Sequence, residues 1–180
     1  MTTRRLFIGL MAGGAREALS QYQLEYDWPS TARLTAPPHL HLTLLFLGNV
    51  EVDVERRMRA ALANVPMTPL SLRLIRADMF PGGIAVLRPE ENRALELLQG
   101  DIAALVQPLD LSIDPKPWVP HVTLARKAQG CVTPQLAAAI EWDVSQFSLV
   151  WSRPDGTGYD VLESWGRPPN IRHEITLLDE

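Results

Sequence analysis

Two short motifs of matching composition stand eighty residues apart in the chain: His41-Leu42-Thr43-Leu44 and His121-Val122-Thr123-Leu124. Both segments have a strand-like composition, and a strand sends alternate side chains to opposite faces. Each motif therefore presents an imidazole and a hydroxyl together on one face, with aliphatic residues on the other. Because one such pair lies in each half of the chain, we expect a single site built from two similar lobes.

Two imidazoles and two hydroxyls are suited to opening a phosphodiester near neutral pH. That reaction needs a base that takes a proton from the attacking water and an acid that gives one to the leaving alcohol. Histidine can do either because its unperturbed pKa is about 6.5. Two imidazoles on opposite sides of one phosphorus can divide the work, and threonine hydroxyls can donate hydrogen bonds to the non-bridging oxygens. The scheme requires no metal and no cofactor.

Each of these residues also has an ordinary structural interpretation. A lone histidine is commonly a hydrogen-bonded core residue, and threonine is favoured in strands for its shape. His39 shares strand parity with His41, so a metal pair is conceivable, but a third ligand is missing and the second motif has no matching histidine. The repetition of the motif favours paired acid–base catalysis over both interpretations and leaves His39 at the rim of the cleft or on the surface.

The elements that position the motifs are strands and helices without regular alternation. Hydrophobic spacing, caps and turn residues predict strands at 5–11, 39–47, 70–75, 84–87, 121–127, 147–151, 159–165 and 171–178, and helices at 15–28, 54–65, 90–107 and 134–140. Glycine and proline at 81–83 and 154–158 predict two hairpins. Recurrent hairpins favour an α+β fold with largely antiparallel sheet. We expect residues 1–180 to form one two-lobed domain, with the motif strands lining a central cleft.

The charge balance and the cysteine content limit the classes of function. The 180 residues carry a formal net charge of −4, so no bulk positive field can hold a long nucleic acid by its phosphates. A few local donors can still hold an RNA end or a single phosphate. The single cysteine, Cys131, cannot form an internal disulfide, which is consistent with a reducing cytoplasm.

The first residues imitate an export signal, because Arg4-Arg5 precede the apolar run 6–11. This run is at the short end of the roughly 7–15 residues that an export core needs, and polar, helix-like sequence follows it directly. We therefore expect a core strand here, and a cytoplasmic protein. No stretch approaches the roughly 20 apolar residues of a membrane span, so no membrane partner is expected.

The motifs and their surroundings resemble those of the two-histidine (2H) phosphoesterase superfamily, and within it the RNA 2′,3′-cyclic phosphodiesterases, historically called 2′-5′ RNA ligases. The resemblance rests on Arg5-Leu6-Phe7-Ile8, on the segment 40–48 around the first motif, and on 120–126, where proline precedes the histidine. It covers essentially the whole chain. One departure is His39, where relatives commonly carry a small polar residue.

The resemblance implies a bilobal fold with pseudo-twofold symmetry that hydrolyses RNA 2′,3′-cyclic phosphate ends to 2′-phosphates without a metal. His41 would be the proton donor to the leaving 3′ oxygen and His121 the base on water. Thr43 and Thr123 would hold phosphate oxygens. The direction of proton transfer comes from the family, because the sequence alone treats the two histidines alike.

Two residues near the second motif are candidate substrate-binding groups. Arg126 would contact phosphate or ribose under the resemblance, although strand parity places it on the face opposite Thr123, away from the cleft. Trp118 could stack on a nucleobase. Its alternative role is hydrophobic packing beneath the proline-rich segment 108–120.

Two other functions fit the same residues. The first is the reverse reaction, in which the same site joins RNA halves through a 2′-5′ bond. The second is a module that binds a nucleotide or RNA end without turnover, since a fold can keep a pocket after losing its chemistry; the presence of both histidines argues against it. RNA ends and small cyclic nucleotides are the candidate substrates, and we expect a monomer without a protein partner.

Overall fold

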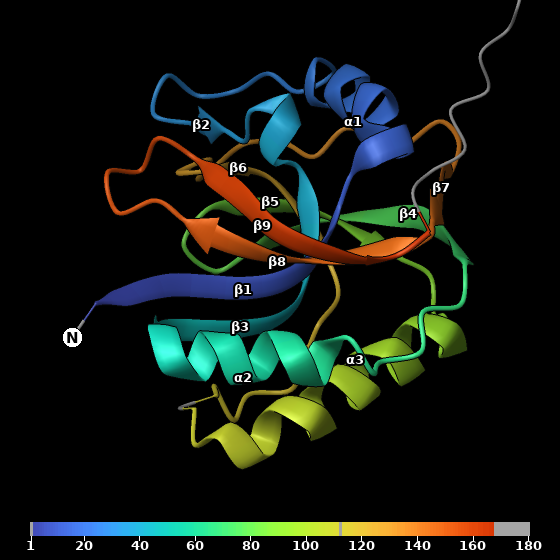
Figure 1. The fold of residues 1–180 in the computed structure, drawn as a ribbon. Helices are drawn as coiled ribbons and strands as arrows, with labels where there is room; N and C mark the ends of the chain where they lie inside the picture. Colours follow the sequence, from blue (N-terminus) through green and yellow to red (C-terminus); the bar gives the residue numbers. More distant parts are fainter. Residues whose placement is uncertain (1, 112, 168–180) are drawn as a thin grey trace, which may run out of the picture.

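The computed structural model describes residues 2–111 and 113–167 (Figure 1). Within these ranges, one sheet contains the strands β1 (Thr3–Met11), β2 (Arg33–Leu34), β3 (His41–Glu51), β4 (Leu70–Phe80), β5 (Ile84–Pro89), β6 (Val122–Arg126), β7 (Ile140–Val144), β8 (Gln146–Ser152) and β9 (Tyr159–Gly166). The helices are α1 (Arg16–Gln23), α2 (Val52–Leu62) and α3 (Arg93–Val106), with 3₁₀ turns at Gly13–Ala15, Pro37–His39 and Gln107–Leu109. No helix of the described part is long and apolar enough to cross a membrane.

The sheet consists of two four-stranded halves that meet at the motif strands. Its order is β7-β4-β5-β6-β3-β1-β8-β9, with β2 added on β6, and the paired strands are antiparallel. The halves are joined where Leu42 of β3 pairs with Val122 of β6. Helices α2 and α3 pack together below β1 and β3, and α1 lies at the opposite end (Figure 1). The predicted α+β fold with two lobes of antiparallel sheet is confirmed.

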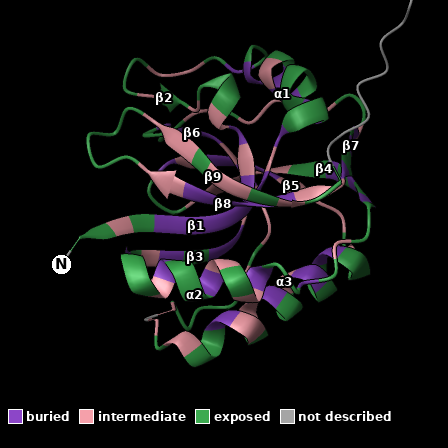
Figure 2. Ribbon diagram, viewed as in Figure 1, coloured by how far each residue is buried: buried purple, intermediate pink, exposed green. Residues whose placement is uncertain are grey.

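Aliphatic side chains of the central strands form the core. Leu42 and Val122 are both fully buried, and Figure 2 shows buried residues concentrated along β1, β3 and β8. Helix α3 adds its apolar stripe, including Leu95, Leu98 and Ile102. It is capped by Asn92, whose side chain accepts a hydrogen bond from the Leu95 amide (3.0 Å). The amphipathic spacing of α3 and its asparagine cap explain why this helix forms and which face it buries.

The helix predicted at 134–140 is wrong, because no helix forms there. Ile140 instead begins β7, which pairs with β4 at the edge of the sheet and buries Ile140, Trp142 and Val144 on one face. The Pro134 carbonyl accepts a hydrogen bond from the Tyr22 hydroxyl (2.7 Å). The helix-start signal at Pro134 therefore does not determine the structure of this segment. Tertiary contacts and the period-two pattern of β7, which the prediction missed, favour a strand.

The other elements agree with expectation within a few residues. Both predicted hairpins, β4–β5 and β8–β9, are confirmed. Helix α1 ends at Gln23, earlier than predicted, and the short strand β2 was not foreseen. The strand predicted at 171–178 lies outside the described residues.

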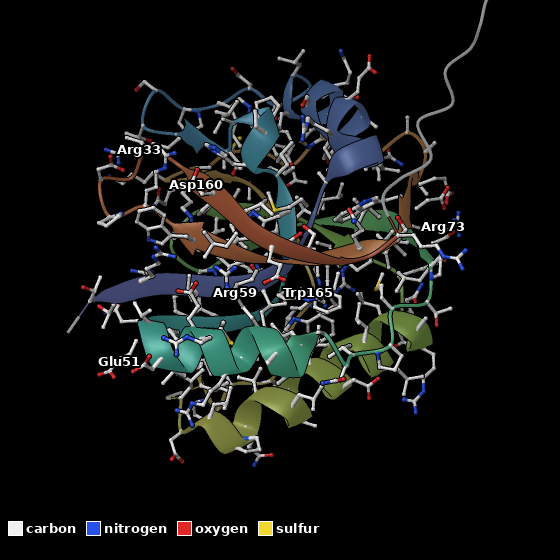
Figure 3. All side chains as sticks on the ribbon, in the orientation of Figure 1. Arg33, Glu51, Arg59, Arg73, Asp160 and Trp165 are labelled. Carbon is white, nitrogen blue, oxygen red and sulfur yellow. The ribbon has the colours of Figure 1, made fainter. Side chains whose placement is uncertain are left out.

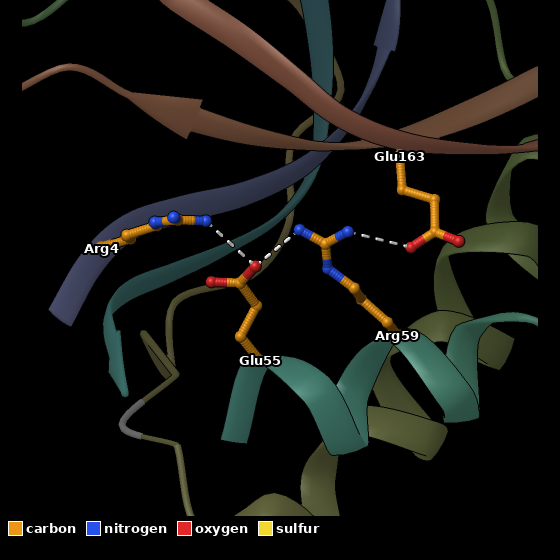
Figure 4. A network of polar contacts seen from close by, with 4 residues as sticks. All are labelled: Arg4, Glu55, Arg59 and Glu163. Atoms are coloured by element: carbon orange, nitrogen blue, oxygen red, sulfur yellow. Dashed lines mark hydrogen bonds and ion pairs between the residues drawn. The ribbon is translucent and has the colours of Figure 1, made fainter. Parts of the chain in front are cut away.

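Ion pairs fasten the outer strand β9 to the rest of the molecule. Glu55 of α2 is buried and accepts hydrogen bonds from Arg59 (2.6 Å) and from Arg4 of β1 (3.4 Å), while Arg59 also pairs with Glu163 of β9 (3.3 Å) (Figure 4). Near the start of β9, Asp160 pairs with Arg153 through two contacts of 2.7 Å; Figure 3 labels Asp160 and Arg59 on their elements. Ion pairs thus hold β9 near its start and at its middle, and the strand begins with a residue of the site described next.

Candidate active site

The two motif histidines and the two motif threonines line one pocket where the halves of the sheet meet. The cavity has a volume of about 170 Å³. Its remaining lining residues are Arg5, Phe7, Thr35, Phe46, Arg126, Ser152 and Tyr159. Four residues that the sequence placed in two distant motifs therefore share one cavity.

The pairing of Leu42 with Val122 explains why the motifs converge. Both side chains are buried, so the residues on either side of each project to the other face of the sheet. Because β3 and β6 run antiparallel, His41 lies on the Thr123 side of the junction and Thr43 on the His121 side. Each hydroxyl is thus near the imidazole contributed by the other half.

Backbone carbonyl groups determine which ring nitrogen of each histidine remains available. Nδ1 of His41 lies 2.7 Å from the carbonyl oxygen of His39, and Nδ1 of His121 lies 2.7 Å from that of Val119. A carbonyl oxygen can only accept, so Nδ1 carries the proton and Nε2 is left for acid–base chemistry. The same contact, two residues back along the chain, orients both rings.

Aromatic neighbours enclose both imidazoles and change their acidity. The His41 ring stacks on Phe7 (centroids 4.6 Å apart) and meets the edge of Tyr159 (5.1 Å), and the His121 ring meets Phe80 (4.9 Å). Burial lowers the pKa of both histidines below the ordinary 6.5, and the positive charge of Arg126 acts in the same direction on each. In the free protein, both rings are therefore biased toward the neutral form.

Matching β-bulges follow the two motifs. Leu44 is an extra residue between successive β1 partners of β3, and Leu124 is an extra residue between successive β5 partners of β6. Each bulge sends two consecutive residues into the core, so the next residue returns to the motif's face: Phe46 in β3 and Arg126 in β6. The prediction from strand parity that Arg126 leaves the cleft is wrong, because the bulge resets the alternation.

A buried or half-buried glutamine from a helix binds the carbonyl group of each bulge. Nε2 of Gln23 in α1 donates to the carbonyl oxygens of Leu124 and Thr35, both at 2.9 Å, and Nε2 of Gln99 in α3 donates to that of Leu44 (3.3 Å). Gln23 is only 4% exposed. In each half, the side-chain amide of a helix glutamine thus donates a hydrogen bond to the carbonyl group of the bulge.

Trp118 and His39 lie beside the pocket rather than in its lining. The indole Nε1 of Trp118 donates to the Thr43 carbonyl oxygen (3.0 Å), and the half-buried ring packs against the core. His39 is half-buried and its ring meets the edge of Tyr159 (5.3 Å). Over residues 2–111 and 113–167, no three or more His, Cys, Asp or Glu side chains come together as a set of metal ligands.

Sequence reasoning missed lining residues that come from strands remote from the motifs. Arg5 lies on β1, and its guanidinium sits 5.1 Å from the centre of the Phe46 ring. Ser152 and Tyr159 flank the β8–β9 turn. The available signals were exposed Arg5 near the start of a buried strand and Tyr159 directly after a turn. Neither signal reveals which strand becomes the neighbour of a motif.

The arrangement can be compared with known proteins. The family model described as the 2′-5′ RNA ligase superfamily matches residues 16–156. The chain belongs to the 2′-5′ RNA ligase superfamily. Its match spans both motifs, both bulges and the helices behind them.

Individual members of the superfamily are similar to this chain in sequence and in fold. The RNA 2′,3′-cyclic phosphodiesterase of Thermus thermophilus is 34% identical over 150 residues, 72% of this chain and 73% of that protein. The RNA 2′,3′-cyclic phosphodiesterase of Escherichia coli K12 is 26% identical over 168 residues, 90% and 96% of the two chains. The crystal structure of E. coli LigT complexed with ATP has a TM-score of 0.79 at 25% identity, covering 93% of this chain and 100% of that one. The likeness therefore extends over both halves.

Proposed function

We propose that this superfamily member hydrolyses RNA ends bearing a 2′,3′-cyclic phosphate to 2′-phosphomonoesters, without a metal, using His41 and His121 as general acid and base. The observation that carries the proposal is the meeting of both His-x-Thr pairs in one cavity of about 170 Å³. The T. thermophilus and E. coli relatives are named RNA 2′,3′-cyclic phosphodiesterases, which supports the choice of substrate. We include in the proposal that residues 1–180 act as a single two-lobed domain, as a monomer in the cytoplasm.

Each lining group has a defined part in the proposed reaction. Neutral His121 takes a proton from water through Nε2 as the water oxygen attacks phosphorus. Protonated His41 gives its Nε2 proton to O3′ as the P–O3′ bond breaks, which leaves the phosphate on O2′. The hydroxyls of Thr43 and Thr123 donate to the non-bridging oxygens, where negative charge develops. Arg126 adds positive charge at the same phosphate.

The lowered pKa of His41 suits the role of an acid. A weaker hold on the proton increases the driving force for its transfer to the leaving alkoxide. The negative charge of a bound phosphodiester counteracts burial and favours the protonated ring while substrate is present. The negative charge of the substrate thus helps to keep His41 in the protonated form that it needs as the acid.

The proposal is tested with a short RNA that carries a 2′,3′-cyclic end. After incubation with the protein and EDTA, the terminus is analysed: a 2′-phosphomonoester is expected, whereas a 3′-phosphate or an intact cyclic end would contradict the proposal. Either His41→Ala or His121→Ala should reduce the rate on the order of 10²–10⁴-fold. If both variants bound the RNA end as wild type does and the wild type showed no turnover, the protein would be a binding module instead.

A further inference from the structure

The imidazole of His39 is a side chain that the proposed reaction leaves without a role. The backbone carbonyl oxygen of His39 accepts the hydrogen bond from Nδ1 of His41 (2.7 Å), but every residue carries such a group. In the other half of the molecule, Val119 supplies it to the second motif histidine at the same distance. A 3₁₀ turn at Pro37–His39, closed by a hydrogen bond from the His39 amide to the Ala36 carbonyl (2.8 Å), fixes the backbone here. Orienting His41 therefore does not require the ring of His39.

The ring of His39 lies directly against the backbone of the turn that joins β8 to β9. Gly158, the residue before β9, has a φ of +139°, which residues with a side chain rarely adopt. A Cβ atom added to Gly158 would overlap Cε1 of His39 and would lie 2.5 Å from its Nε2. Both the backbone conformation and the contact with the ring therefore require glycine at this position.

The same turn carries two residues of the pocket that contains both motifs. Ser152 and Tyr159 pair with each other on β8 and β9 where the turn begins and ends, and both line the cavity (Figure 1). The amide of Arg153 donates to the carbonyl oxygen of Gly158 (3.0 Å), so the turn is closed on itself. Because β9 is the last strand of the described sheet, contacts made by the turn help to set where its end lies. The ring of His39 makes one such contact, from the segment that leads into β3.

Tyr159 connects His39 to the imidazole of His41. Its ring meets those of His39 (5.3 Å), His41 (5.1 Å) and Phe7 (5.2 Å), each with its plane steeply inclined to theirs. Phe7 also stacks on His41 (4.6 Å), so the four rings form one cluster. Burial is the largest cause of the lowered pKa of His41, and Phe7 and Tyr159 are its aromatic neighbours. The position of Tyr159 thus affects both the orientation and the hydration of His41.

We infer that His39 is a positioning residue for the acid of the proposed reaction: its ring holds the β8–β9 turn, and the turn places Tyr159 beside His41. The inference rests on the proposed function. His39 does not line the pocket, so it acts through Tyr159 rather than on the substrate. Without the ring, Tyr159 loses a neighbour and His41 becomes more hydrated. Water favours the charged form of an imidazole, and a less confined ring is aimed at O3′ for less of the time.

The first measurement is the pKa of His41 in the free protein, followed by NMR of its ring as the pH is changed. His39→Ala should raise this pKa toward the ordinary 6.5, and the pKa of His121, whose ring lies outside the cluster, should change less. The charges of His121, Arg126 and His39 all act on His41, so removal of the His39 charge has the same sign as exposure. His39→Phe removes that charge and keeps a ring, and it should leave the pKa of His41 close to the wild-type value. Equal shifts in the two variants would overturn the inference.

The second measurement is steady-state hydrolysis of an RNA with a 2′,3′-cyclic end. His39→Ala should reduce kcat on the order of 10-fold and leave KM within about twofold, because a displaced acid is costly while the pocket walls remain. His39→Phe should restore kcat. Gly158→Ala, whose Cβ meets the His39 ring, should also reduce kcat. Gly156→Ala is the matched control, since it strains the same turn (φ +73°) where a Cβ has nothing within 4 Å, and it should keep wild-type kcat.

Combining the substitutions isolates the contact between the ring and the turn. The loss of kcat caused by Gly158→Ala should be smaller in the His39→Ala background, because the ring that the new Cβ meets is absent and the backbone strain is common to both backgrounds. Independent losses, or a raised KM with unchanged kcat in His39→Ala, would overturn the inference and leave the proposed function standing. A wild type that hydrolyses no cyclic end would instead refute the proposed function, whereas the pKa comparison in the free protein decides on the contact in either case.

Discussion

In the proposed reaction, Nε2 of each motif histidine is the atom that exchanges a proton with a reacting oxygen, and its surroundings determine the pH at which it can do so. Burial lowers the pKa of both rings below 6.5. The acid His41 is active when protonated, so kcat/KM should fall as pH rises through its lowered pKa. The base His121 is active when neutral, so kcat/KM should fall as pH drops below its own lowered pKa. The bell-shaped profile of kcat/KM should therefore lie on the acid side of pH 6.5.

The measurement is kcat/KM and kcat across the pH range on one cyclic-phosphate RNA. The two limbs report apparent pKa values of the coupled pair, because each ring's charge affects the other. Bound phosphodiester raises the pKa of His41, so the alkaline limb of kcat should lie at a higher pH than that of kcat/KM. A kcat/KM optimum above about pH 7 would contradict the assigned environments.

Arg126 lowers the pKa of both histidines and, in the proposed reaction, adds positive charge at the phosphate, so its removal should change two observables at once. Its charge lowers the pKa of His41 and of His121, and Arg126→Gln should shift both limbs of the kcat/KM profile to higher pH. Loss of a charged donor should also reduce kcat/KM by about 10-fold or more. Lys127→Gln removes an adjacent exposed charge as the control. If Arg126→Gln reduced kcat/KM without shifting either limb of the profile, the control of the histidine pKa values by Arg126 would be contradicted.

At the scale of elements, the two β-bulges bring Phe46 and Arg126 to the pocket. We expect Gln23 to stabilise the bulge at Leu124. Gln23→Leu leaves the Leu124 and Thr35 carbonyls without their buried donor, which should cost about 1–3 kcal/mol of unfolding free energy. Because the bulge aims Arg126, the folded variant should also show a raised KM. Denaturant unfolding and steady-state kinetics check both effects. Gln21→Leu, on an exposed position of α1, is the control, and lost stability with unchanged KM would show that the bulge does not depend on Gln23.

The same bulges mark how far prediction from sequence can reach. Period-two and helical spacing are local properties, so β3, β6, α3 and the two hairpins could be predicted from them. A bulge depends on the register with a partner strand, which for β6 is β5, more than thirty residues earlier in the chain. Alternation alone therefore placed Arg126 on the wrong face. Likewise, the edge strand β7 depends on β4 as its partner, and a local proline signal at 134 suggested a helix.

At the scale of the molecule, the candidate active site is formed only where the two halves of the sheet meet. The stability of each half and the geometry of the site are therefore separable. Leu42 and Val122 pair at the junction, and Leu72 is equally buried in β4, away from it. Leu42→Ala and Leu72→Ala remove the same atoms from a core and should each cost about 2–5 kcal/mol of unfolding free energy. Only Leu42→Ala loosens the contact that places the His41 pair against the His121 pair.

Catalysis should therefore distinguish the two variants where stability does not. Under conditions in which both remain folded, Leu42→Ala should lose at least about 10-fold in kcat, because small displacements of paired acid and base are costly, and Leu72→Ala should keep wild-type kcat. A double-mutant cycle that combines Leu42→Ala with Val122→Ala should give a coupling energy of about 0.5–3 kcal/mol in the free energy of unfolding, because the two residues pair across the junction. Equal losses of kcat in the two leucine variants would contradict this expectation. They would mean that contacts other than the Leu42–Val122 pair hold the two halves in register and keep the pocket formed.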